Sequence, residues 1–409
     1  MKRRIIVVLV VMLALLALSG CGGLPAAPER VRIAITLTEQ LWEFMEFGNA
    51  TELALEEYRA RGNGPEVELV VVAVGTEEDP VGYYDTAIEA EAVQRAIDDP
   101  EVVVIVGGSS GPMVQTGIPI ANRAGLAYIG GGGYWAGLTQ PGYGPGEPGI
   151  HYPSGVRTFF RMVTRDDVSM RRAADFIVEE LGAETVYIVN SSDIMSGVSF
   201  AGQFELAAGD VGMTVLAHES YDETTATQEE VEALAQRVVD AQPDVLYVSW
   251  TARTNFLYYV RALDPDMVIF GTELTDYPIN EPPEGHSISE LDGVYYQDQY
   301  PHPSLLDNDV ARAFVSNYES RYGELGATWG GSVALMYEMT GVALYAIERA
   351  ETPTREGVLQ SLQNLGTYSG LYGDWTFTPE GDMTVGFSVI HQFQDGEFQR
   401  VDFAILEQD

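Results

Sequence analysis

Short apolar runs alternate with amphipathic stretches along most of this chain. The apolar runs are rich in Val and Ile and predict buried strands at 31–37, 67–74, 102–106, 127–130, 186–190, 245–249 and 267–270. The stretches between them have helical periodicity and predict helices at 48–61, 85–98, 112–123, 167–181, 197–208, 228–241 and 254–263. Strands that alternate with helices in this way indicate βαβ units, with parallel sheets covered on both faces. The pattern predicts an α/β fold.

A long irregular segment divides the pattern into two series. Residues 130–155 are dense in Gly and Pro and have no periodicity, which is typical of a long loop. A new series begins after it, so we expect the chain to cross into a second lobe near Arg157. Residues 293–300 predict a strand that leads back to the first lobe, because two long helices follow at 309–322 and 331–349. The tail predicts antiparallel strands at 374–377, 384–393 and 397–403.

These crossings predict two similar lobes joined by a hinge of three chain segments. Lobe 1 is expected to contain residues 31–157 plus 299–365. Lobe 2 is expected to contain residues 158–298 plus 366–409. About 380 residues are enough for two domains of ordinary size.

The first thirty residues follow a different pattern. Basic residues 2–4 precede fourteen apolar residues, 5–18, a stretch too short to span a membrane comfortably. Residues 1–20 therefore predict a secretory signal peptide. The run Leu-Ser-Gly-Cys that ends at Cys21 resembles the bacterial lipobox, which implies a diacylated cysteine at the new N-terminus. We expect an extracytoplasmic protein anchored to the cell membrane through Cys21, with residues 21–30 as the tether.

Charge and cysteine content narrow the function further. Removal of residues 1–20 takes three of the 22 basic residues, so 19 remain against 61 acidic residues, a net charge of −42. Such an acidic chain is repelled by phosphate backbones, which argues against nucleic-acid binding. Cys21 is the only cysteine, so the folded body has no disulfide. No His pair stands at helical spacing, and we expect neither a metal nor a cofactor.

Ligands of open α/β sheets bind beyond the carboxyl ends of the strands. The residues that follow the predicted strands are mostly small hydroxyls, glycines and aromatics, with Trp135 among them. This mixture suits a small polar or zwitterionic ligand, because exposed N–H groups favour a carboxylate and an acid favours an ammonium group. The predicted binding residues are Trp42, Ser109, Ser110, Gly132, Tyr134, Ser196, Trp250 and Glu273.

Each of these residues also has a purely structural interpretation. The glycines at 130–133 could form a flexible turn, and each tryptophan could pack in a core or between lobes. Ser109 or Ser110 could simply cap the helix that follows. Glu273 could be a surface glutamate in a very acidic chain.

A serine hydrolase is the main enzymatic alternative. Residues 107–111 (GGSSG) fit the pattern G-x-S-x-G between a strand and a helix, with Ser109 as nucleophile and His391 as a late histidine. However, the glycine run at 130–133 follows the serine, whereas the oxyanion loop of hydrolases precedes it. His391 also lies within an alternating strand pattern. We therefore expect a protein that is not an enzyme.

The order of several short motifs resembles the type I periplasmic binding proteins, specifically the branched-chain-amino-acid (Leu/Ile/Val)-binding type of ABC importer receptor. The resemblance covers about residues 31–401. Its segments are VIVGGSSG at 104–111, FFR at 159–161, IVNSSDIMSG at 188–197, FVSNYESRYG at 314–323 and, most specifically, YSGLYGDWTFTPEGD at 368–382. The family implies two Rossmann-like lobes that close on a ligand, and docking on a membrane permease.

The family's residue roles transfer to some of the positions named above. The turn that holds the ligand carboxylate matches Ser109 or Ser110, and the acid that holds the ammonium group matches Glu273. A backbone-donor loop matches Gly132 and Tyr134, while Ser196 stands where the family has a tyrosine.

The resemblance implies a lipoprotein that captures an amino acid, amide or related amine and delivers it to an ABC permease. A lipoprotein of the same fold that feeds a sensor or activates an envelope enzyme remains the alternative.

Overall fold

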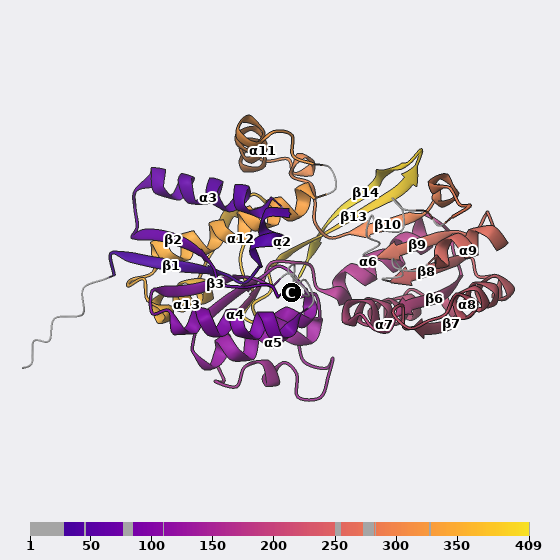
Figure 1. The fold of residues 1–409 in the computed structure, drawn as a ribbon, viewed down its shortest axis with the longest axis horizontal. Coiled ribbons are helices and arrows are strands. Elements are labelled where there is room, and N and C mark those ends of the chain that lie inside the picture. Colours follow the sequence, from indigo (N-terminus) through magenta and orange to yellow (C-terminus); the bar gives the residue numbers. More distant parts are fainter. Residues whose placement is uncertain are drawn as a thin grey trace, which may run out of the picture.

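The computed structural model describes residues 28–44, 46–76, 85–108, 110–249, 255–272, 282, 284–326 and 329–408. These residues form two lobes that lie side by side and are joined near the middle of the molecule (Figure 1). Cys21 and the predicted signal peptide lie outside the described residues.

A five-stranded parallel sheet forms the centre of lobe 1, in the order β2-β1-β3-β4-β5. Its strands are β1 (Arg30–Ile35), β2 (Glu66–Val71), β3 (Val102–Gly107), β4 (Ala127–Gly130) and β5 (Phe159–Arg161). The central strand β3 (VVVIVG) is buried along its whole length, as expected for a strand covered on both faces.

Helices cover both faces of this sheet. On one face α3 (Phe47–Arg61) packs against α12 (Gly330–Arg349), and on the other α4 (Thr86–Asp98) packs against α5 (Gly111–Arg123). The smaller elements of this lobe are α2 (Glu39–Phe44), α11 (Asp309–Tyr322), α13 (Arg355–Gln363), β11 (Tyr368–Gly370), β12 (Gly373–Trp375) and the short helices η1 (Ala136–Leu138), η2 (Gly149–His151) and η4 (Pro303–Leu305).

Lobe 2 contains a seven-stranded sheet in the order β14-β13-β10-β9-β8-β6-β7. Its strands are β6 (Thr185–Ser191), β7 (Thr214–Tyr221), β8 (Val245–Ser249), β9 (Ile269–Thr272), β10 (Tyr295–Asp298), β13 (Val385–Gln394) and β14 (Glu397–Glu407). The first five are parallel, and β13 runs antiparallel to β10 and β14. The helices α6 (Asp166–Glu179) and α7 (Met195–Asp210) pack together on one face, and α8 (Gln228–Ala241) and α9 (Phe256–Leu263) on the other, with η3 (Ile288–Leu291) beside α9.

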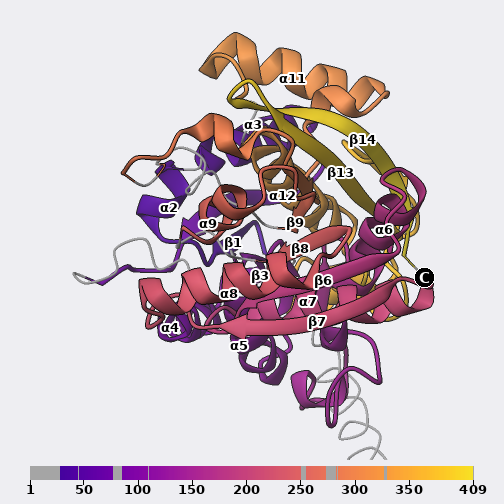
Figure 2. The ribbon, with the colours of Figure 1, turned by 90° about the vertical axis from the view of Figure 1, so that its right-hand side faces the viewer.

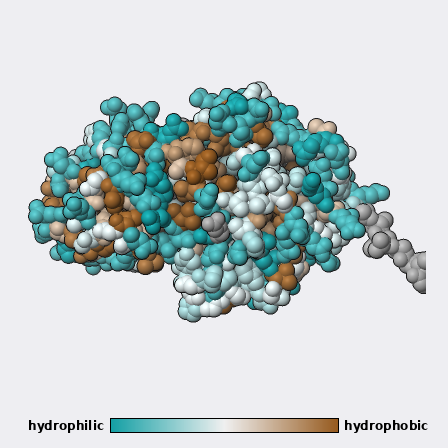
Figure 3. Space-filling view, turned by 180° about the vertical axis from the view of Figure 1, so that it is seen from behind, coloured by the Kyte–Doolittle hydropathy of each residue, from teal (hydrophilic) through white to brown (hydrophobic). Residues whose placement is uncertain are grey.

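Three chain segments connect the lobes. The chain leaves lobe 1 after Arg161, returns after Asp298 and crosses again near Asp382, where Arg161 and Asp382 form a parallel bridge. Figure 2 shows β13, β14 and α6 together on one side of the molecule, with α2 and α9 on the opposite side. Seen from behind, apolar residues gather on the surface where the lobes meet (Figure 3). Edge strand β14 leaves Val401 and Ile405 exposed.

The predicted α/β class with two lobes and parallel sheets is confirmed. The sequence analysis did not predict β7, because this edge strand is only partly buried and carries His218, Glu219 and Ser220 near its end. It also omitted the nine-residue α13.

The lobe boundaries lie a few residues from the expected positions. We expected the first crossing near Arg157, but β5 still belongs to the sheet of lobe 1. We expected lobe 2 to resume at residue 366, but the β11–β12 ribbon packs on lobe 1. Its loop is held there by the buried Glu338 carboxylate, which accepts hydrogen bonds from Leu371 N and Trp375 Nε1, both at 2.8 Å.

Candidate functional site at the junction of the lobes

The turn between β3 and α5 begins with two glycines, which expose backbone at the carboxyl end of the lobe 1 sheet. Gly108 has a φ of 70°, a conformation that favours glycine. A Cβ atom on Gly107 would collide with the hydroxyl of Thr36, so this position has no room for a side chain. Gly108 N donates a hydrogen bond of 3.1 Å to Thr36 Oγ1, which fixes the turn on β1.

Ser110 ends this turn with a hydroxyl group that has no partner. It is the N-cap residue of α5 with extended backbone, yet its side chain makes no capping hydrogen bond. The residue is 3% exposed, and its Oγ has no hydrogen-bond partner in the described part of the protein. Because buried hydroxyls are nearly always paired, this group is available for a hydrogen bond beyond those that the described residues make. Capping therefore does not account for Ser110.

Three of the predicted binding positions meet next to this serine. A Cβ atom built on Gly111 would lie 3.7 Å from the carbonyl oxygen of Gly132 and 3.7 Å from Oγ of Ser196. Gly132 follows β4 in lobe 1, whereas Ser196 lies in the first turn of α7 in lobe 2. The two lobes are therefore closed against each other here. A space of about 20 Å³ remains between them, lined by Gly111, Gln115, Tyr134, Trp135, Leu138, Met195, Ser196 and Ser199.

A buried ion pair at the hinge holds the glycine loop that follows β4. Arg161 Nε donates to Asp382 Oδ1 at 2.8 Å, and both side chains are fully buried. The same guanidinium donates to the carbonyl oxygens of Gly133 and Trp135. Burial alone would raise the pKa of Asp382, but the positive charge of Arg161 holds that pKa below its usual value. The loop is thus fixed by the hinge and is not merely a flexible turn.

The two aromatic residues after this loop are both held by other side chains. Tyr134 is 7% exposed; its hydroxyl forms a hydrogen bond with the hydroxyl of Tyr300, and its ring lies 5.2 Å from that of Phe200 in α7. Trp135 donates from Nε1 to both carboxylate oxygens of Glu147, at 2.9 and 3.0 Å. Tyr134 therefore sits where the two lobes and the second crossing meet, and Trp135 is fixed at the edge of the small space.

Asp166 joins the lobes beside Tyr134. Its carboxylate accepts hydrogen bonds from Ala136 N in lobe 1, at 2.9 Å, and from the Ser199 hydroxyl in lobe 2. Burial raises the pKa of Asp166 to about 7. Asp166 was not among the predicted site residues, because nothing in the sequence distinguishes it from the other 60 acidic residues. The sequence analysis also gave no role to the Arg161–Asp382 pair, whose members are 221 residues apart.

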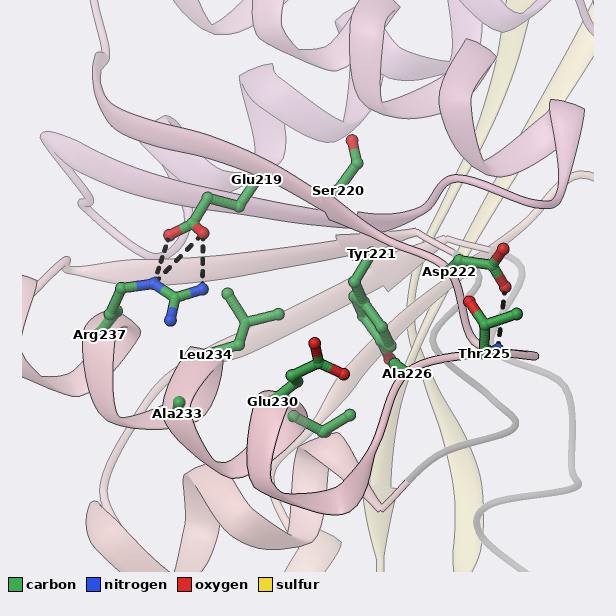
Figure 4. Close-up of a pocket in the computed structure, with 11 residues that line it drawn as sticks. Glu219, Ser220, Tyr221, Asp222, Thr225, Ala226, Glu230, Ala233, Leu234 and Arg237 are labelled. Atoms are coloured by element: carbon green, nitrogen blue, oxygen red, sulfur yellow. Dashed lines mark hydrogen bonds and ion pairs between the residues drawn. The ribbon is translucent and has the colours of Figure 1, made fainter.

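A second, larger hollow lies at the outer edge of lobe 2 (Figure 4). This open groove of about 420 Å³ runs between the edge strand β7 and helix α8. Its charged side chains already interact with other residues of this chain. Glu219 pairs with Arg237 at 2.7 Å, and Glu230 forms the capping box of α8. All of its lining residues come from lobe 2, so it does not share the two-lobed geometry of the site at the junction.

The family model described as periplasmic binding protein matches residues 44–396, which is most of the chain. This chain belongs to the periplasmic binding protein family. The predicted family is therefore confirmed, and membership implies an extracytoplasmic location. No individually curated protein matches the chain in sequence.

Solved periplasmic binding proteins share the fold at low sequence identity. A leucine-binding protein, LivK, from Thermotoga maritima is 21% identical, with 92% of this chain and 98% of that chain covered and a TM-score of 0.69. LivJ from Streptococcus pneumoniae, in complex with isoleucine, is 15% identical over 93% and 99% of the chains, with a TM-score of 0.70. A solute-binding protein from R. palustris, in complex with 4-hydroxybenzoate, is 16% identical over 93% and 98%, with a TM-score of 0.67.

Within this periplasmic binding fold, the predicted site residues have different surroundings. The structure brings Ser110, Gly132, Tyr134 and Ser196 to the junction of the lobes. Trp42 lies on α2, partly buried against the lobe 1 core, with its indole nitrogen against Gly48 of α3. Ser109, Trp250 and Glu273 lie outside the described residues.

The hydrolase alternative receives no support from the position of His391. This histidine lies on β13 in lobe 2, with its ring near those of Tyr296 and Phe398, at 6.1 and 6.4 Å. Burial lowers its pKa to about 4. The G-x-S-x-G turn belongs to the other lobe.

No helix in the described part of this chain is both long enough and apolar enough to cross a membrane.

Proposed function

We propose that this periplasmic binding protein captures one small amino-acid-like ligand between its two lobes and delivers it to an ABC permease, without catalysing a reaction. The observation that carries the proposal is the buried hydroxyl of Ser110 at the start of α5, which has no hydrogen-bond partner among the described residues. Next to it lie the glycine turn of lobe 1 and Ser196 of lobe 2. The chemistry there suits a carboxylate, because the N–H groups of a helix start and a free hydroxyl can all donate to it.

Several further assignments belong to this proposal. Ser109 and Ser110 would hold the ligand carboxylate together with the backbone at Gly132. Glu273 would hold the ammonium group, and Trp42, Tyr134, Ser196 and Trp250 would form the remaining walls. The bound relatives support a carboxylate ligand, since LivJ was solved with isoleucine and others with leucine and 4-hydroxybenzoate, and the two amino acids also support an ammonium group.

Closure would supply the signal for delivery. A ligand that contacts both lobes stabilises the closed arrangement by its differential affinity for the two states. The space that remains at the junction of the lobes is about the size of one water molecule, so the lobes would have to move apart to admit the ligand.

We further propose that Cys21 is lipidated and that residues 21–30 tether the lobes to the membrane. Support comes from the apolar segment and the Leu-Ser-Gly-Cys run in the sequence. Expression of the Cys21→Ser variant tests this step, since a lipoprotein loses its membrane-bound fraction on that substitution. An unchanged membrane fraction would refute the anchor.

A thermal-shift panel tests the binding function itself. The panel contains amino acids, amides, small amines and aromatic acids such as 4-hydroxybenzoate. At least one member should raise the Tm by several degrees at 1 mM, and Glu273→Ala should reduce that shift for ligands with an ammonium group only. If no ligand of the panel raises the Tm, the proposed function is refuted.

A further inference from the structure

A buried acid lies beneath the glycine turn of lobe 1. Glu89 is in the first turn of α4 and is completely buried. Its Oε1 accepts a hydrogen bond of 2.7 Å from the Tyr128 hydroxyl, and interaction with the nearby Thr36 hydroxyl also favours its charged form. Its Oε2 has no hydrogen-bond partner among the described residues. A buried carboxylate normally requires a cation or several donors, and this one has only two hydroxyls.

The same two hydroxyls support the turn from below. Thr36 Oγ1 accepts the hydrogen bond from Gly108 N and blocks any side chain at Gly107. A Cβ atom on Gly108 would lie 2.6 Å from the Tyr128 hydroxyl. The turn therefore packs against Thr36 and Tyr128, and Glu89 holds Tyr128 in place by its hydrogen bond.

The surroundings of Glu89 favour its neutral form. Tyr128 comes from β4, Thr36 directly follows β1, and Gly117 of α5 lies so close that a Cβ there would be 2.7 Å from Glu89 Oε1. Of these only Tyr128 is titratable, and none carries a positive charge. The first turn of a helix favours an acidic side chain in its charged form, but burial outweighs this and raises the pKa of Glu89 to about 8.

We propose that Glu89 is a positioning residue for the carboxylate-binding turn, acting through Tyr128 and Thr36, and that the turn binds an anionic ligand more tightly while Glu89 carries its proton. This inference rests on the proposed function. Loss of the proton would leave an uncompensated negative charge under the turn. That charge would repel the ligand carboxylate and draw both hydroxyls away from the backbone they support.

The sign of the pH dependence follows from this arrangement. Ligand binding favours the protonated form, so affinity should stay constant below the pKa of Glu89 and fall as the pH rises through it. If a bound carboxylate raises that pKa by one unit, the full loss is about tenfold in Kd.

Calorimetric titration with L-leucine and 4-hydroxybenzoate between pH 6 and 9 tests the inference. For the wild type we expect the Kd of a probe that binds to weaken about fivefold between pH 6 and pH 9. In Glu89→Gln the Kd should vary less than twofold. In Tyr128→Phe, which removes a hydrogen bond that favours the charged acid, the loss should begin at higher pH than in the wild type.

Glu338→Gln is the matched control. Glu338 is also a fully buried acid of lobe 1 with a raised pKa, but it binds the β11–β12 ribbon instead of the turn. This variant should keep the wild-type pH profile of binding even where its stability changes. Equal pH profiles of Kd for the wild type and Glu89→Gln would overturn this inference but leave the proposed function standing. Absence of binding by every probe at every pH would overturn the proposed function and the inference with it.

Discussion

At the residue scale, the most informative group is the hydroxyl of Ser110. Its position was predictable, because ligand groups of α/β sheets follow the strands and Ser110 follows β3. Its lack of a partner was not predictable, since capping of α5 was an equally good interpretation of the sequence. Arg161, Asp382 and Asp166 were missed for a different reason. Their roles depend on contacts between segments far apart in the chain, such as Asp166 with Ser199.

A pair of serine substitutions tests this distinction without any ligand. Ser110→Ala removes a hydroxyl that has no hydrogen-bond partner among the described residues, so the free energy of unfolding should change by less than about 0.5 kcal/mol. Ser199→Ala removes a hydrogen-bond donor to the buried Asp166 and should lower the free energy of unfolding by about 1.5 kcal/mol. Urea unfolding at pH 8 measures both values. A larger loss for Ser110→Ala than for Ser199→Ala would show that Ser110 has a structural role.

At the scale of elements, the hinge is organised by a buried charge pair. The strand and helix pattern predicted most elements correctly, because the central strands are apolar throughout and the long helices are amphipathic. It failed where burial is incomplete, as in β7, and where an element is short, as in α13. The end of lobe 1 was placed too early because β5 has only three residues, too few to show a periodicity.

Removal of the charge on Asp382 should destabilise this hinge strongly. Asp382→Asn leaves the guanidinium of Arg161 buried without its counter-charge, which costs about 3–5 kcal/mol of unfolding free energy. Asp307→Asn removes one partner of an ion pair on the surface and should have no measurable effect. Guanidinium chloride unfolding compares the two variants. Similar small losses in both would contradict the hinge assignment.

At the scale of the whole molecule, three buried acids make stability depend on pH. Burial raises the pKa of Glu89 to about 8 and those of Asp166 and Glu338 to about 7. Each of these acids holds its proton in the folded state over a pH range in which the unfolded chain has lost it. Their contribution to stability is therefore complete below about pH 4 and is lost progressively up to about pH 8. Asp382 has a lowered pKa, so its contribution to stability is lost as the pH falls, but only at pH values below its usual pKa.

We expect the protein to be more stable at pH 5 than at pH 8. Glu89→Gln should reduce the slope of unfolding free energy against pH by up to about 1.4 kcal/mol per unit in this range. Repulsion within the acidic surface also lowers stability as the pH rises. Salt screens this repulsion, whereas it screens the effect of buried groups much less. Urea unfolding at several pH values in 0.5 M NaCl separates the two effects. A slope that 0.5 M NaCl abolishes would contradict the role of the buried acids.

The central claim is that one small carboxylate ligand binds between the lobes at Ser110. Isothermal titration calorimetry of the wild type and Ser110→Ala, with the ligand that gives the largest shift in the thermal panel, tests it most directly. The account predicts one site per chain in the wild type and a Kd at least tenfold weaker in Ser110→Ala, at unchanged stability. Equal affinity in the two proteins, or a stoichiometry other than one, would contradict it.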